Sequence, residues 1–143
     1  MLDAYRDLID ELLGTPTEIR GAVEVDGGDP ASPETLRLIA EMRDRDRMVL
    51  ERIQTIRERD MPYLKAEQMA ATLPDDDLPA LLDAMELARG DLISFLMNLT
   101  IKDWQRAAIH ETEGEITLAD EVERHVEFDE AQRGRLRELG ATP

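Results

Sequence analysis

Apolar residues recur every three or four positions along four long stretches of the chain, which is the spacing of helices with one apolar face. The first stretch covers residues 2–13 and is expected to end at Gly14. Thr15-Pro16-Thr17-Glu18 then carries the signals of a helix start, so we expect a short separate turn there. The cluster Gly27-Gly28-Asp29-Pro30 predicts a loop.

The other three stretches have clear start signals. Ser32-Pro33 is expected to open a helix that runs to about Arg59, and an apolar stripe starts a third helix at Leu78. Between them, Pro62 and Pro74 bracket a predicted loop that contains a short helix around 67–71. Thr100 is expected to cap one or two turns that hold Trp104, and Thr117 is expected to cap a last helix over 118–139.

Four long helices joined by short or partly helical connections predict an all-α fold, a four-helix bundle. The chain has 143 residues, which favours a single domain spanning 1–143. It has no cysteine, so disulfides and cysteine-based metal sites are excluded. No apolar run approaches the roughly 20 residues of a membrane span, and no signal peptide is recognisable, so we expect a cytoplasmic protein without a membrane partner.

The formal charge is −16, from 33 acidic and 17 basic residues. This balance disfavours nucleic acid as a partner unless a local basic patch exists. The densest basic run, between Arg43 and Arg59, alternates with acidic residues. Alternating signs along a helix predict a solvated, salt-bridged face.

The region from Leu99 to Gln132 resembles the C-terminal half of the DinB-like superfamily. The resemblance rests on Asp103-Trp104-Gln105-Arg106, on His110, on Gly114 ahead of Thr117-Leu118, and on the helix that follows. Glu41-Met42-Arg43-Asp44-Arg45-Asp46-Arg47 similarly resembles a motif in the second helix of that family. The resemblance implies a bundle with an up-down-down-up course.

The resemblance also implies where a divalent metal would lie in such a protein. Family members bind the metal through histidines, and the matching positions here are Glu41, Phe128 and Gln132. A phenyl ring cannot coordinate Zn²⁺ or Ni²⁺, and a Gln amide is a poor ligand for either ion. We therefore expect no metal and no other cofactor, and we expect Phe128 to fill the space that the metal occupies in relatives.

Two further polar residues lie on the same face of the last helix. His125 is interpreted as a buried, hydrogen-bonded side chain, or alternatively as a pH-sensitive group or general base. Asp129 is interpreted as the partner of a nearby arginine or as the cap of a polar pocket. Together with Glu41 and Gln132 they mark a remnant pocket for a small polar ligand, because buried polar groups need partners.

The resemblance implies two alternative functions. One is a non-catalytic, stress-associated binding or interaction protein that has lost the metal triad. The other is an enzyme, a thiol-dependent S-transferase or metal-dependent hydrolase, with a rebuilt site around Glu41, His125 and Asp129. No hydrolase elbow, phosphate loop or Cys-His pair is present to support a different enzyme. The resemblance also implies a homodimer.

Overall fold

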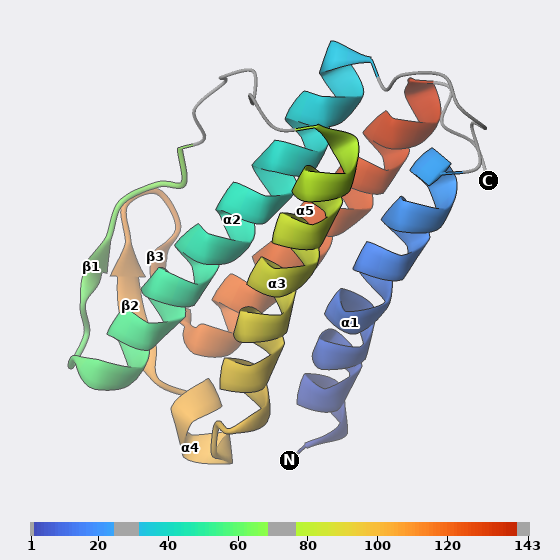
Figure 1. The fold of residues 1–143 in the computed structure, drawn as a ribbon. Helices are drawn as coiled ribbons and strands as arrows, with labels where there is room; N and C mark the ends of the chain where they lie inside the picture. The colour runs from blue at the N-terminus through green and yellow to red at the C-terminus, as the bar shows by residue number, and fades with distance from the viewer. Residues whose placement is uncertain (1, 25–31, 69–76, 140–143) are drawn as a thin grey trace.

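The computed structural model describes residues 2–24, 32–68 and 77–139 of the chain. The predicted loop at 27–30 and residues 69–71 of the predicted short helix lie outside these ranges. The described residues contain four long helices: α1 (Asp3–Glu24), α2 (Pro33–Glu58), α3 (Leu78–Met97) and α5 (Leu118–Glu138). The predicted four-helix bundle is confirmed (Figure 1).

Two apolar clusters at the two ends of the bundle fix the direction of each helix. The first cluster, next to α4 (Ile101–Trp104), contains Leu12 of α1, Ile56 of α2, Leu96 of α3 and Leu118 of α5. The second contains Ile19, Leu38, Leu81 and Leu136 of the same four helices. Hence α1 and α5 run in one direction and α2 and α3 in the other, as Figure 1 shows by its colours.

The predicted helix starts agree with the caps in the structure. Ser32 accepts a hydrogen bond from the amide of Thr35, and Asp77 does the same for Ala80. Thr100 and Thr117 each form a reciprocal capping box with the aspartate three residues later. These bonds satisfy amides that a helix start leaves without partners.

The first helix differs from the prediction, because α1 continues through Gly14 and has Pro16 in its interior. A proline here lacks the amide that would bond to the carbonyl of Leu12, four residues earlier. That carbonyl instead accepts a 2.6 Å hydrogen bond from Nη1 of Arg89 on α3. A tertiary contact thus satisfies the group that would otherwise favour a break.

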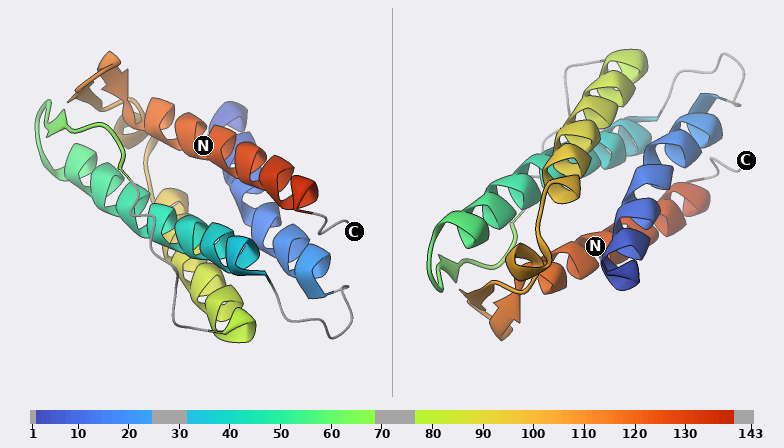
Figure 2. Two further views of the ribbon diagram at one scale, coloured as in Figure 1. Left: turned by 90° about the horizontal axis from the view of Figure 1, so that it is seen from above. Right: turned by 90° about the horizontal axis from the view of Figure 1, so that it is seen from below.

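A small sheet, which the sequence pattern did not predict, lies at one end of the bundle. It consists of β1 (Tyr63–Leu64), β2 (Ala107–His110) and β3 (Gly114–Thr117). β1 pairs parallel to β2, and β2 pairs antiparallel to β3. Figures 1 and 2 place this sheet beside the end of α2 and the start of α5.

Candidate functional site

The positions that the family resemblance assigns to metal ligands lie on two neighbouring antiparallel helices. Nε2 of Gln132 on α5 donates a hydrogen bond of 3.2 Å to Oε2 of Glu41 on α2. Nη1 of Arg135 donates to the same Glu41 oxygen over 3.1 Å and to Oε1 of Gln132 over 2.8 Å. The structure therefore brings Glu41 and Gln132 together, with Arg135 as the cation that binds both.

Phe128, the third position, is half-buried and not fully enclosed as the sequence had led us to expect. Its ring packs against the second apolar cluster, and its centroid lies 6.0 Å from that of His125. The guanidinium carbon of Arg45, on α2, lies 4.5 Å from the centroid of the phenyl ring. A guanidinium at this distance from an aromatic face makes a cation–π contact.

His125 and Asp129 belong to a separate network, in the centre of the bundle. Nε2 of His125 lies 2.5 Å from Oδ1 of Asp46 on α2. Arg89 on α3 donates to both carboxylates, with bonds of 2.9–3.1 Å to Asp46 and 2.8–2.9 Å to Asp129. All four side chains are at least 97% buried. No hydrogen bond or ion pair between described residues links this network to Glu41.

Arg89 is the cation that makes this buried network possible. Burial alone would lower its pKa, but the negative charge of Asp46 and the hydrogen bonds with Asp129 outweigh that effect and raise the pKa. Arg89 therefore stays charged and balances one of the two carboxylates in full. The sequence offered a signal for it: Arg89 lies four residues after Met85, within the apolar stripe of the third helix.

Asp46 was also missed, because it lies in the run of alternating charges that we interpreted as a solvated face. That interpretation is wrong for part of the run. Arg45 and Asp46 are buried, and only 11% of the Arg52 side chain is exposed. Arg52 binds Glu121 of α5, Arg45 lies over the Phe128 ring of α5, and Asp46 contacts His125 of α5 and Arg89 of α3.

A second charged cluster lies next to the sheet and contains Glu67, His110, Glu121, Arg52 and Arg124. Arg52 binds Glu121 with two hydrogen bonds of 2.6 and 3.0 Å and contacts Glu67 over 3.2 Å. Arg124 donates to both oxygens of Glu67. Burial would raise the pKa of Glu67, but hydrogen bonds from Arg124 and from the backbone, and the charges of Arg52 and Arg124, lower it to about 2.

The ligand atoms of Glu67, His110 and Glu121 lie within 4.8 Å of one another, close enough to suggest a metal site. The hydrogen bonds around the imidazole oppose this role. Nδ1 of His110 accepts from the backbone amides of Thr112 and Glu113, so the ring proton belongs on Nε2, which faces Glu67. A metal needs the lone pair of that same Nε2, and two guanidinium groups already hold the carboxylates.

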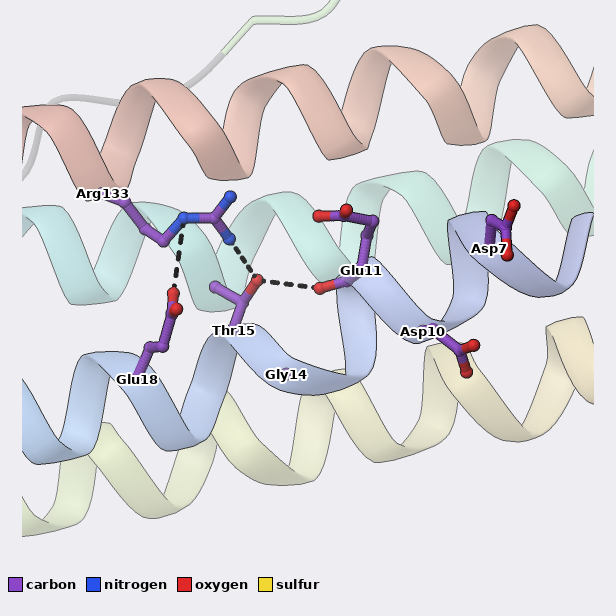
Figure 3. Close-up of a pocket in the computed structure, with 7 residues that line it drawn as sticks. All are labelled: Asp7, Asp10, Glu11, Gly14, Thr15, Glu18 and Arg133. Atoms are coloured by element: carbon purple, nitrogen blue, oxygen red, sulfur yellow. Dashed lines mark hydrogen bonds and ion pairs between the residues drawn. The ribbon is translucent and has the colours of Figure 1, made fainter. Parts of the chain in front are cut away.

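A groove of about 460 Å³ lies between α1 and α5 (Figure 3). Its lining residues are Asp7, Asp10, Glu11, Gly14, Thr15, Glu18 and Arg133. Arg133 donates to Oγ1 of Thr15 over 2.9 Å and pairs with Glu18 over 3.5 Å. The groove is acidic, and its Arg133 and Thr15 side chains already have partners.

Comparison with solved structures finds YfiT from Bacillus subtilis, described as "a probable metal-dependent hydrolase with an unusual four-helix bundle topology". The TM-score is 0.76 at 17% sequence identity, and the match covers 98% of this chain and 90% of that chain. The likeness confirms the four-helix bundle fold. No family model and no curated protein matches this sequence.

One further observation concerns membranes. No helix among the described residues is both long and apolar enough to cross a bilayer.

Proposed function

We propose that this chain is a metal-free, non-catalytic binding or interaction protein built on a DinB-like bundle. The observation that supports the proposal is that arginines of the chain hold the interior carboxylates at which a metal would bind. Arg135 holds Glu41, and Arg89 holds Asp46 and Asp129. A guanidinium and a divalent cation compete for the same oxygens, so binding of the ion would first have to displace the arginine.

The side chains at the family's ligand positions do not fit a divalent metal either. Glu41 is the one strong ligand among them, and its carboxylate already accepts from Gln132 and Arg135. Phe128 has no atom that can coordinate a metal, and the Oε1 of Gln132 accepts from Arg135. Thiol transferases of the resembled family use a metal to lower the pKa of the attacking thiol. These three side chains would not bind that metal, so the thiol could not be activated in this way.

The rival proposal is an enzyme with a rebuilt site around Glu41, His125 and Asp129. The description of YfiT as a probable metal-dependent hydrolase favours it, and so does the histidine beside two carboxylates at the bundle centre. Against it, Glu41 belongs to a different hydrogen-bond network from His125 and Asp129. The central network is also buried, which leaves a substrate no direct access to it.

Elemental analysis of untagged protein separates the two proposals. We expect the purified chain to carry no stoichiometric metal, and Zn²⁺ or Ni²⁺ to produce no saturable heat in a calorimetric titration. As a matched control, Glu41→His, Phe128→His and Gln132→His together should create affinity for either ion. A triple variant that stays metal-free would show that the family's ligand positions are assigned to the wrong residues.

We also propose that the binding role is stress-associated and that the chain acts as a homodimer, as the resemblance implies. Exposed leucines on neighbouring helices, Leu13 of α1 and Leu87 of α3, support a dimer surface. Because each chain carries a charge of −16, association should tighten as salt rises. Light scattering tests this directly, and a mass near 16.2 kDa at all micromolar concentrations would contradict it.

A further inference from the structure

Within the described part of the chain, Arg45 differs from Arg89, the other buried arginine, in having no hydrogen-bond or ion-pair partner for its side chain. Only 9% of its surface is exposed, and its Nε–H has no hydrogen-bond acceptor. No carboxylate among the described residues lies in ion-pair contact with it. Arg89, by contrast, donates to two carboxylates and a backbone carbonyl.

The two carboxylates whose charges act most strongly on Arg45 are already bound by other arginines. Glu67 and Glu121 attract Arg45, but Arg52 and Arg124 hold them in direct contact and repel Arg45. Arg45 is therefore the guanidinium of this cluster that is left without a carboxylate in direct contact. Arg124, at the edge of the cluster, also pairs with Glu113, whose side chain is 53% exposed.

An unpaired buried charge is costly, so an arrangement that maintains one suggests that a partner arrives from outside. The Phe128 ring lies against the guanidinium, and the terminal Nη groups, which unlike Nε are not fully buried atoms without a partner, remain able to donate. The edge that they form matches the two oxygens of a carboxylate. Since Phe128 is half-buried, the stack lies close to the surface of the α2–α5 face.

We propose that Arg45, positioned on Phe128 between α2 and α5, is the binding site for a small organic monocarboxylate. The assignment rests on the proposed binding function, for which it names the class of ligand. A single negative charge matches the one guanidinium of this cluster that has no carboxylate partner among the described residues. A phosphate carries up to two negative charges and would be repelled more strongly by Glu67 and Glu121.

The test is a calorimetric titration of the full chain, treated with a chelator, with acetate and with benzoate at constant ionic strength. Benzamide serves as the neutral analogue of benzoate, and inorganic phosphate serves as the more highly charged anion. We expect one saturable site for both carboxylates and weaker binding of benzamide and phosphate. No saturable carboxylate binding, or tighter binding of phosphate, would overturn the assignment.

Variants of Arg45 test whether its side chain binds the carboxylate. Arg45→Met should weaken benzoate binding by about tenfold or more, the value of one charge-assisted hydrogen bond. Arg45→Lys keeps the charge without the planar fork and should give an intermediate loss. Arg47→Met is the matched control, because Arg47 lies on the same helix with 60% of its side chain exposed, and it should bind as the parent does.

Thermal unfolding distinguishes a ligand site from a structural role. If Arg45 serves a ligand, Arg45→Met should leave the unliganded melting temperature unchanged or raise it, because an unpaired charge is removed. A lower melting temperature together with unchanged benzoate binding would show that Arg45 acts in folding. Elemental analysis of the untreated protein decides the metal-free function separately, so the two proposals fail by different measurements.

Discussion

Nη1 of Arg89 donates a 2.6 Å hydrogen bond to the carbonyl oxygen of Leu12, 77 residues away in the chain. This carbonyl is the one that Pro16, inside α1, leaves without an intrahelical donor. The same guanidinium holds Asp46 and Asp129. One side chain thus joins all four long helices, and it does so at the centre of the bundle.

Replacement of Arg89 by Met should therefore destabilise the protein strongly. It leaves two buried carboxylates without their cation, a change that typically costs about 3–5 kcal/mol. Urea denaturation at neutral pH measures the loss, with Arg47→Met as the surface control, which should change stability by less than about 0.5 kcal/mol. A loss below about 1 kcal/mol for Arg89→Met would show that water reaches the carboxylates.

A double-mutant cycle with Pro16→Ala isolates the contact with Leu12. Alanine at this position supplies an amide for the Leu12 carbonyl, so Pro16→Ala should be more favourable by about 1 kcal/mol in the Arg89→Met background than in the parent. If the two effects add within about 0.3 kcal/mol, the carbonyl does not depend on Arg89.

Truncation of Phe128 to Ala should cost less than removal of a fully enclosed ring. The usual range for a buried Phe is 3–5 kcal/mol, and for this half-buried ring we expect about 1–3 kcal/mol. Phe128→Leu should cost less, since it retains most apolar contacts. In the Arg45→Met background the loss should shrink by about 0.5–1 kcal/mol, the value of the cation–π contact. An equal loss in both backgrounds would show that Arg45 does not stabilise the ring.

The cluster beside the sheet should make stability depend on acidity. The pKa of Glu67 falls from 4.5 to about 2 on folding. Its contribution to the free energy of unfolding is therefore fully present above pH 4.5 and is lost as the pH falls toward 2. Glu67→Gln should lower stability at neutral pH and flatten the curve of unfolding free energy in that window. Glu113→Gln, which removes an exposed partner of Arg124, is the control and should leave the curve close to that of the parent. If the unfolding free energies of Glu67→Gln and the parent vary with pH in the same way, the lowered pKa of Glu67 is contradicted.

Helices with local signals were predictable, whereas contacts between distant residues were not. Ser32 and Thr117 identify helix starts because a cap depends on residues three positions apart. The continuity of α1 through Pro16 depends on Arg89, which no local pattern connects to it. The strands of the sheet have two to four residues, too short to show an alternating pattern.

The candidate site was predicted only in part, because most of its contacts also join residues that are distant in the sequence. The family resemblance placed Glu41 near Gln132, and the two are hydrogen-bonded. It gave no sign that Arg135 binds both or that Asp46 joins His125, because charges on a helix say little about which of them turn inward. An arginine within an apolar stripe, as at Arg89, is the signal that sequence reasoning could have used.

We propose above that arginines of this chain take the place of a metal among its buried and partly buried carboxylates. The most direct measurement is the metal content of untagged, full-length protein after gel filtration, determined by plasma mass spectrometry. We expect substoichiometric amounts of every transition metal, even after incubation with Zn²⁺ or Ni²⁺. One ion retained per chain would contradict it and would favour the enzyme.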